Sequence, residues 1–509
     1  MRGEPQDDVV ADQRWSRRCP PRARLLSRGA NLSDPRRQTR RIAFGTAARL
    51  VGRTLGAVIS LLALREATRY FGPVQWGPIT AALAWFTVFS YLGSPGLATL
   101  TMREIARPRA DVGSVFGQAL KATLMISLGA ALVSLVLALP VYWGRSITLS
   151  MVLILAPGVP LTALFLTSGS VLVGTRRSGT RALLDLVSSV FLLGATLFVV
   201  DTQLRPRGYA VAFVASLAAT ALAAVALAVY AVRPKFNSTR EELVGMLRAS
   251  LPLGQFDLFA VVYARADSIM LFLIKGSRPT AWYGLAFQIA TFLFALPALL
   301  ANTVLPDFMS ESIERRHFLA RRALDVLLTI SLPLPVFGVV FARPFVIWLA
   351  GKDFSRAGPL LAILTIAAAI SLVNGYLFQM AVYAGAEKGL WRAVGVVTAA
   401  NLAANAVAVS VWGATGAAVV MILSEAVGLG LYWHVYRTTM PSPLGRRYPL
   451  SVVLATLGLI GTWWALHAGL GVKTGIGVGI LPRVAGLMAI YFALVWGITT
   501  CARCLTSAR

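Results

Sequence analysis

Cysteine, histidine and charge are scarce in this sequence, and each scarcity excludes a class of protein. Three cysteines in 509 residues cannot build a disulfide framework, and the three histidines are too far apart in the sequence to suggest a metal site or a catalytic triad. Cys501 and Cys504 have C-x-x-C spacing but no partner Cys/His pair, so we interpret them as adventitious thiols. Charged residues make up only 14% of the chain, against about 25% in an ordinary soluble domain.

The sequence also has no glycine-rich phosphate-binding loop and no long hydrophilic loop between its apolar segments. A membrane glycosyltransferase or polymerase would use such a loop to hold its acceptor. We therefore predict a protein that is not an enzyme and that has no cofactor and no metal site. Active transport would have to draw on an H⁺ or Na⁺ gradient, or on the gradient of the substrate itself.

What the sequence does contain is hydrophobic residues, 57% of the total, in long runs. A helix needs about 20 mainly apolar residues to cross a bilayer, and only helices and closed barrels satisfy every backbone polar group there. The runs have helix length, so we predict an all-α integral membrane protein with about fourteen transmembrane helices. The predicted spans of the first half are 43–64, 78–94, 115–140, 148–173, 182–200, 209–232 and 250–274. Those of the second half are 281–304, 322–346, 358–384, 391–412, 415–437, 450–468 and 478–500.

The net charge of +27 is distributed over alternate loops. Lys and Arg are more frequent in the loops that are cytoplasmic if both termini are cytoplasmic, which is the usual orientation signal. We therefore expect contact with anionic lipids rather than nucleic acid, and a multi-pass location in the bacterial cytoplasmic (inner) membrane. Residues 1–42 are polar, basic and without a signal-peptide core, so we predict a disordered cytoplasmic tail, an over-extended gene start being the alternative.

Ionisable residues within the predicted spans are the main candidates for a functional site, because each costs several kcal/mol at the bilayer centre unless it faces a cavity or a partner. Arg49 and Arg53 are one helical turn apart in the first span and share a face, and Arg53 lies nearer the middle. Arg265 and Asp267 lie in the seventh span, but two residues apart on a helix they point about 200° away from each other and cannot both face one cavity. We predict substrate binding by Arg53, Arg265 and Arg49.

Three carboxylates are candidates for ion coupling: Asp267, Asp185 and Glu425. For Asp267 a role in the lumen or ion pathway is favoured over a buried salt bridge. For Asp185 and Glu425, as for Lys121 and Asp257, a structural role is favoured.

An internal similarity indicates a transporter built from two halves. Phe71-Gly72-Pro73 is followed by Trp76-Gly77 and a new helix, and Gly276 is followed by Tyr283-Gly284 and a new helix. Repeated bundles leave such weak similarity, with the binding site at the interface of the repeats. Pro157 and Pro160 in the fourth span, and Pro333 and Pro335 in the ninth, predict interrupted helices.

These motifs, in this order, resemble the polysaccharide exporters of the multidrug/oligosaccharidyl-lipid/polysaccharide flippase superfamily. The resemblance covers most of the chain and rests on the following residues: Arg69-Tyr70-Phe71-Gly72-Pro73, Trp76-Gly77, Gly93, Gly96-Leu97, Arg103-Glu104-Ile105-Ala106-Arg107, Asp267, Tyr283-Gly284-Leu285-Ala286, Asn401-Leu402, Asn405, Gly413, Gly416-Ala417-Ala418 and Ser424-Glu425.

The resemblance implies two six-helix bundles around a central cavity, residues 43–232 and 250–437, and two additional helices within 449–500. It also implies a substrate, an undecaprenyl-diphosphate-linked oligosaccharide that moves from the inner to the outer leaflet by alternating access. A diphosphate needs cationic partners such as Arg53 or Arg265, while its polyprenyl tail can stay in lipid. A polysaccharide polymerase and glycosyltransferases are the expected protein partners.

Three other functions remain open from the sequence, besides a non-transporting scaffold, which is expected if the arginines within the spans are all paired and no cavity exists. A lipid II flippase would share the lipid diphosphate and therefore the cationic cavity. A drug/cation antiporter would require acidic residues in the cavity, and the buried arginines speak against it. A membrane glycan ligase or polymerase belongs to another class and is disfavoured by the short loops.

Overall fold

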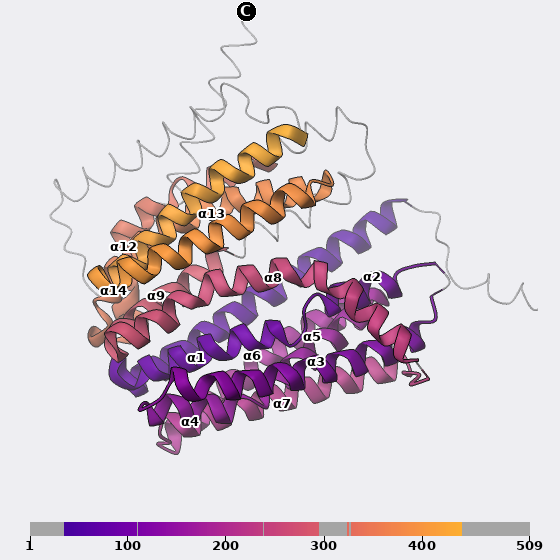
Figure 1. The fold of residues 1–509 in the computed structure, drawn as a ribbon, viewed down its shortest axis with the longest axis horizontal. Helices are drawn as coiled ribbons and strands as arrows, with labels where there is room; N and C mark the ends of the chain where they lie inside the picture. The colour runs from indigo at the N-terminus through magenta and orange to yellow at the C-terminus, as the bar shows by residue number, and fades with distance from the viewer. Residues whose placement is uncertain (1–34, 109, 238, 295–322, 325–326, 440–509) are drawn as a thin grey trace, which may run out of the picture. The chain divides into compact units, whose positions relative to one another are not determined.

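The computed structural model describes residues 35–108, 110–237, 239–294, 323–324 and 327–439, and Figure 1 shows their course. Residues 1–51 form one unit, of which 35–51 are the start of a helix, and residues 52–509 form the other. The helices of the first half are α1 (Pro35–Leu92), α2 (Leu97–Ile105), α3 (Val112–Val141), α4 (Ser146–Leu155), α5 (Gly158–Gly174), α6 (Ser178–Asp201) and α7 (Pro206–Ala231). Those of the second half are α8 (Arg240–Lys275), α9 (Ser277–Phe294), α12 (Leu334–Ala350), the short 3₁₀ turn η3 (Lys352–Phe354), α13 (Ala357–Tyr383) and α14 (Glu387–Thr439).

These helices confirm the prediction of an all-α membrane protein. Seven stretches of the described residues are helical, long and apolar enough to cross a membrane: Val112–Val141, Ser146–Gly174, Ser178–Asp201, Pro206–Ala231, Leu327–Ala350, Ala357–Val382 and Gly389–Thr438. The predicted spans 450–468 and 478–500, and residues 295–322, lie outside the described residues. Of the predicted disordered tail 1–42, residues 1–34 also lie outside them, and residues 35–42 belong to helix α1 instead.

The structure differs from the prediction at several boundaries. Predicted spans one and two form α1, bent at Gly72, and spans eleven and twelve form α14, bent at Gly413, so that each bend is one non-helical glycine. The short helix α2 was not predicted. Helix α8 begins at Arg240, ten residues before the predicted start of its span, because Thr239 and Glu242 cap its first turn reciprocally.

The interruptions predicted at prolines are present. Helix α4 ends at Leu155 and α5 begins at Gly158, with Pro157 between them. Helix α12 begins directly after Pro333. A proline removes one backbone hydrogen bond and its ring clashes with the preceding turn, which accounts for a break at each position.

A left-handed residue recurs at every described corner on the side opposite the predicted cytoplasmic termini, which we call the outer side. Along the chain these corners contain Gly72, Gly144, Gln203, Gly276, Gly351 and Gly413, each with a positive φ. Glycine adopts this conformation without a steric penalty. Gly72 and Gly276, which follow the first and the seventh predicted span, have similar backbone angles (φ 62°, ψ 175° and φ 79°, ψ −163°), which supports the interpretation of two repeated halves.

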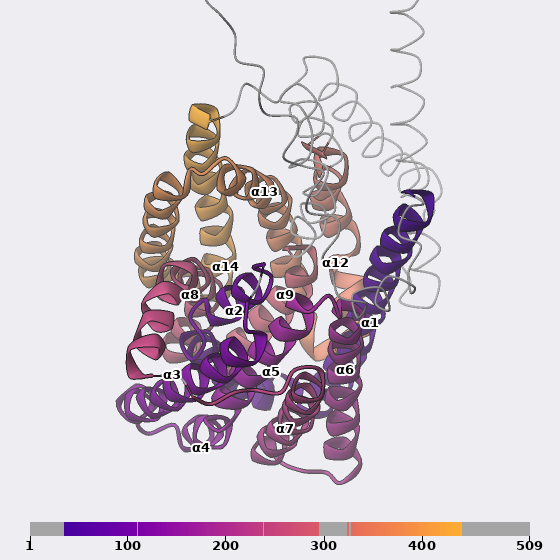
Figure 2. The same ribbon diagram turned by 90° about the vertical axis from the view of Figure 1, so that its right-hand side faces the viewer.

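Helix α8 packs against both halves of the chain. Its first part lies on α2 and α3, where Met246 joins a buried cluster with Leu97 and Ala122. Its second part packs on α9 and α14. Figures 1 and 2 show α8 running between the helices of the first half and those of the second.

The linker between the halves, residues 232–239, is fastened to the start of α3. The backbone N–H of Lys235 donates to the carbonyl oxygen of Gly113 (2.9 Å), and its ammonium binds the Asp111 carboxylate (2.9 Å). This hydrogen bond from Lys235, with that from the Ser114 N–H, holds the pKa of Asp111 below its ordinary value. The linker passes so close to Gly117 that a Cβ there would lie 1.9 Å from the Lys235 carbonyl oxygen.

We therefore expect Gly117→Ala to lower the thermal unfolding midpoint of the purified protein in detergent, because overpacking against backbone costs about 1–3 kcal/mol. Gly129→Ala is the matched control, since Gly129 lies in the same helix and a Cβ there would meet no atom within 4 Å. Equal midpoints for the two variants would show that the linker is not held against α3.

Candidate functional site

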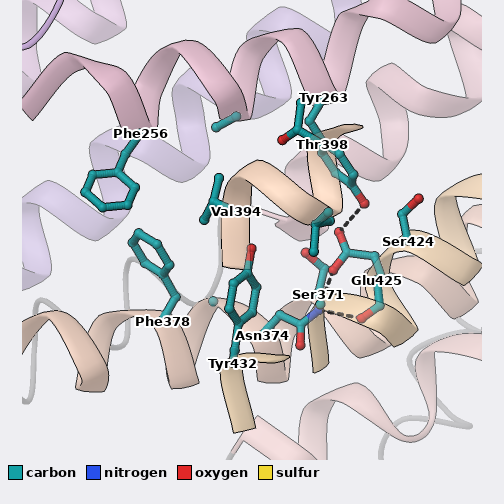
Figure 3. A pocket seen from close by; sticks show the side chains of 14 residues that line it. Phe256, Tyr263, Ser371, Asn374, Phe378, Val394, Thr398, Ser424, Glu425 and Tyr432 are labelled. Carbon is teal, nitrogen blue, oxygen red and sulfur yellow. Dashed lines mark hydrogen bonds between the residues drawn. The ribbon is translucent and has the colours of Figure 1, made fainter. Parts of the chain in front are cut away.

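Two adjoining cavities lie among α1, α8, α9, α13 and α14. The central cavity, about 380 Å³, is lined by residues of all five helices. The second, about 230 Å³, lies among α8, α13 and α14 (Figure 3). Ala260, Tyr263, Ser371 and Glu425 line both, so a group bound in the central cavity lies next to the second one.

Arg265 brings a positive charge to the central cavity. Its guanidinium lies 5.6 Å from the centre of the Phe287 ring, a cation–π distance. It makes no ion pair with a described residue. Asp257 and Tyr91 line the same cavity. Arg265 is thus available to a ligand that enters between the halves.

Asp267 faces away from this cavity. Its side chain is buried, and it accepts hydrogen bonds from the Tyr283 hydroxyl and the Ser268 N–H. The tyrosine of the Tyr283-Gly284 motif therefore has a structural role, because its hydroxyl binds the Asp267 carboxylate. Arg265 and Asp267 do not face one cavity, as expected from their helical spacing.

Glu425 lies at the boundary of the two cavities and is buried (Figure 3). One carboxylate oxygen accepts a hydrogen bond from the Tyr263 hydroxyl of α8 (3.1 Å), and the other from the Asn374 amide of α13 (2.7 Å). Three helices therefore meet at one carboxylate, and a change in its protonation or ligation would act on all three.

Further amides extend this polar group along α14. The Asn401 amide donates to the Ser424 hydroxyl (2.9 Å), and the Asn405 amide donates to the carbonyl oxygen of Asn401 (3.1 Å). The side-chain carbonyl oxygens of Asn374 and Asn405 accept no hydrogen bond from the described residues, although both are buried. Buried oxygen atoms beside a carboxylate can accept a proton's hydrogen bond or act as ligands of a hard cation such as Na⁺.

The other predicted site residues lie elsewhere. Asp185 on α6 pairs with Arg181 one turn earlier (2.9 Å) and lines neither cavity. Lys121 donates to the carbonyl oxygen of Phe236 in the linker. Arg49 and Arg53 belong to helix α1, but their side chains lie outside the described residues. Among described residues, no three His, Cys, Asp or Glu side chains lie close enough to hold a metal.

Sequence reasoning missed Tyr263 and Asn374 as partners of Glu425. An asparagine in an otherwise apolar span was the available signal, because an amide in lipid requires a hydrogen-bond partner. The short connection between α13 and α14 indicates that the two helices are neighbours, but not which residue of one contacts which residue of the other, so the partner could not be identified without the fold.

The two halves are joined on the outer side by arginines that bind helix C-termini. Arg69 of α1 donates to the carbonyl oxygens of Trp348 (2.5 Å) and Leu349 (3.0 Å) at the end of α12. Arg145 donates to the carbonyl oxygen of Leu273 (2.6 Å) near the end of α8. The last carbonyls of a helix have no partner within it and carry partial negative charge, so both contacts favour close approach of the two halves on this side.

Glycines allow the helix ends to approach closely at the same level. A Cβ at Gly77 would lie 2.2 Å from the carbonyl oxygen of Ser277, and a Cβ at Gly284 would lie 2.3 Å from the Thr80 side chain. The two aromatic–glycine motifs of the sequence therefore pack reciprocally, each glycine against the start of the opposite helix.

The chain matches a known sequence family. The family described as "Polysaccharide biosynthesis protein" matches residues 42–311, slightly more than half of the chain. No curated protein is significantly similar in sequence.

Solved membrane transporters share the fold. "Lipid II flippase MurJ, inward closed conformation" has a TM-score of 0.72 at 12% identity, covering 88% of this chain and 97% of that one. An inward-facing multidrug resistance MATE family transporter of the MOP superfamily has a TM-score of 0.63 at 16% identity, covering 77% and 97%. An outward-facing structure of such a MATE transporter reaches 0.51 at 16% identity, covering 77% and 93%.

We expect Gly77→Ala to open the outer side, because the added methyl group would collide with the Ser277 backbone. Overpacking of about 1–3 kcal/mol would shift the balance between conformations by at least about fivefold. Labelling of Thr87→Cys, at the central cavity, by an impermeant maleimide from the outer side measures the shift in a background without native cysteines. Gly129→Ala should leave the labelling unchanged, and an equal rate in both variants would contradict a closing role for the Gly77 contact.

Proposed function

Because this chain belongs to the polysaccharide biosynthesis protein family, we propose that it flips an undecaprenyl-diphosphate-linked oligosaccharide across the bacterial cytoplasmic membrane by alternating access. The family and the fold neighbours are those of membrane transporters and flippases, not of enzymes. The identity of the lipid-linked glycan is the part of the proposal that experiment must decide.

The observation that carries the proposal is the Arg265 guanidinium, which lines a cavity between the two halves and makes no ion pair with a described residue. A diphosphate moving through the membrane interior needs a cationic partner, and guanidinium groups bind phosphate oxygens in a fork-like geometry. Arg53 and Arg49 are the further proposed contacts. Thr87, Thr291 and Ser371 supply hydroxyl groups on the cavity wall, which suit a glycan, while the polyprenyl chain stays in lipid.

The size of the central cavity supports a cycle with an opening step. At about 380 Å³ it lies at the lower end of small-ligand pockets, which hold about 300–1,000 Å³. An oligosaccharide requires more room, so the halves must separate before it enters. The outer side is held by Arg69, Arg145 and the glycine contacts, which favours first opening toward the inner side, with α8 as the helix that spans both halves.

We propose that the ion that drives the cycle acts at Glu425. Of the three carboxylates suggested by the sequence, Glu425 alone lines both cavities, whereas Asp267 is bound by Tyr283 and Asp185 by Arg181. Protonation or Na⁺ binding at Glu425 would alter its bonds to Tyr263 of α8 and Asn374 of α13. That would couple the ion to the packing of the second half against the central cavity.

A second candidate function, drug/cation antiport, is favoured by the two carboxylates of the central cavity, Asp257 and Glu425. An organic cation would pair with them and be repelled by Arg265. A lipid II flippase differs from the main proposal only in the glycan. Glycosyl transfer by the purified protein would revive the ligase or polymerase alternative.

The proposed surroundings follow from the same chemistry. The substrate is made on the cytoplasmic side by glycosyltransferases and used on the outer side by a polysaccharide polymerase, so these are the proposed partners, together with the membrane lipids. We propose that both termini are cytoplasmic and that nucleic acid is not a partner.

Flipping of a fluorescent polyprenyl-diphosphate oligosaccharide in proteoliposomes tests the main proposal. We expect Arg265→Ala to slow flipping by about 10- to 100-fold, since a hydrogen bond to a charged group contributes about 1.5–3 kcal/mol, and Arg53→Ala to slow it as well. Arg248→Ala is the matched control, because Arg248 is an exposed residue of the same helix that lines neither cavity. Export of small cations by wild-type protein that moves no lipid-linked glycan would favour the antiporter instead.

The same vesicles with an imposed Na⁺ or pH gradient test the coupling site. Glu425→Gln keeps the size of the side chain but removes its charge, so we expect flipping that no longer responds to the gradient. Asp185→Asn should retain the response, because Asp185 lines neither cavity. If both variants keep the wild-type response, Glu425 is not the coupling residue.

A further inference from the structure

A third cavity, about 480 Å³, lies at the outer end of the second half and shares no lining residue with the two central ones. It is lined by the end of α8, the start of α9, the start of α13 and the bend of α14 at Gly413. Neither ion coupling nor the flipping path requires it.

The charge of this pocket is entirely positive. Lys275 and Arg356 line it, both side chains are exposed, and neither makes an ion pair with a described residue. None of the lining residues carries a carboxylate. Arg356 is held in place over the Trp282 ring, with 5.0 Å between the guanidinium carbon and the ring centre.

Three helical segments begin at the pocket and add to its positive potential. Helix α9 begins at Ser277, α13 begins at Ala357 and has no side-chain cap, and the second part of α14 begins after Gly413. Pro279, Pro359 and Ala414 line the cavity close to these starts. Helix N-termini favour anions, particularly phosphate.

The corresponding corner of the first half is filled. By chain order it lies where α1 bends, α4 begins and α7 begins. Phe71, Trp76 and Tyr209 pack edge to face there, with ring centres 5.6–6.0 Å apart. Arginines also begin α4 and α7 at this corner, Arg145 and Arg205, so what distinguishes the corner of the second half is that it is hollow.

The rim of the pocket indicates what kind of anion it takes. Val411 and Trp412 line it with side chains that are 63% and 66% exposed, and Val407, one turn before Val411, is 65% exposed. In a membrane protein such a row is covered by acyl chains, and tryptophan belongs at the level of the headgroups. A ligand with a phosphate in the pocket and hydrocarbon on this row satisfies both surfaces.

We propose that this pocket binds the headgroup of an anionic membrane phospholipid, with its phosphate between Lys275 and Arg356. The phosphate lies at the starts of α9 and α13, and the acyl chains lie along α14. The bound lipid bridges α8, α9, α13 and α14, so it holds the outer end of the second half together.

Titration of the purified full-length protein in detergent with phosphatidylglycerol tests the proposal, with the thermal unfolding midpoint and the number of retained lipids, by native mass spectrometry, as readouts. We expect Lys275→Gln/Arg356→Gln to need at least about tenfold more phosphatidylglycerol for the same midpoint shift, because each basic side chain near a lipid surface adds about a fivefold preference. Lys352→Gln is the matched control, an exposed lysine of the same outer corner that does not line the pocket.

Zwitterionic phosphatidylcholine should stabilise the wild type less than phosphatidylglycerol, since its choline would be repelled by the two cations. Arg356→Lys keeps the charge, so it should retain most of the response. Such a result would show that a loss in the double variant comes from the missing charge and not from misfolding. An equal response of wild type and double variant, or an equal loss in Lys352→Gln, would overturn the proposal. A full response to soluble glycerol phosphate would overturn the assignment to a lipid.

Discussion

A polar group inside the bilayer has no water to bond, and this constraint organises the described structure. Asp267 is bonded by Tyr283, Glu425 by Tyr263 and Asn374, and the ends of α8 and α12 by arginines of the other half. The arginine contacts and the Tyr263–Glu425 bond join helices that are more than 100 residues apart in the sequence, whereas the Asp267–Tyr283 and Asn374–Glu425 bonds join consecutive helices. Because an unpaired partner would cost several kcal/mol in lipid, movement of the halves must exchange these bonds for others instead of breaking them.

The described parts of the two halves differ in their chemistry. The second half contains the buried carboxylate, its amides and the cationic outer corner, whereas aromatic rings fill the corresponding outer corner of the first. Such a difference suits a rocking cycle. The first half would move as a rigid body, and the helices of the second half would change their packing when an ion or ligand binds. Gly77 and Gly284, the glycines of the two aromatic–glycine motifs, allow the halves to pack closely against each other on the outer side.

The class of fold could be predicted from the sequence because lipid permits few structures, and the positions of Pro157 and Pro333 correctly indicated breaks. The family resemblance, read from motifs such as Trp76-Gly77, is confirmed by the match over residues 42–311. Sequence spacing also separated Arg265 from Asp267. The sequence could not show that Glu425 is hydrogen-bonded to α8 and α13, because those bonds depend on tertiary packing. Nor could it show that α8 starts at Arg240, because the start is set by a polar cap outside the apolar run.

The residues with a positive φ at the six described outer corners, such as Gly144 and Gly351, determine where the chain can accept an inserted peptide, both in engineered variants and in evolution. These corners are short, from a single bent glycine at Gly72 and Gly413 to six residues between α12 and α13, and each needs a positive φ at one position, so an inserted peptide would disturb the helix ends on both sides. Epitope tags, protease sites and natural insertions are therefore expected to be tolerated in the longer inner connections and not on the outer side. Among the described residues, that side therefore offers only short connections as a surface for an antibody or another protein to bind.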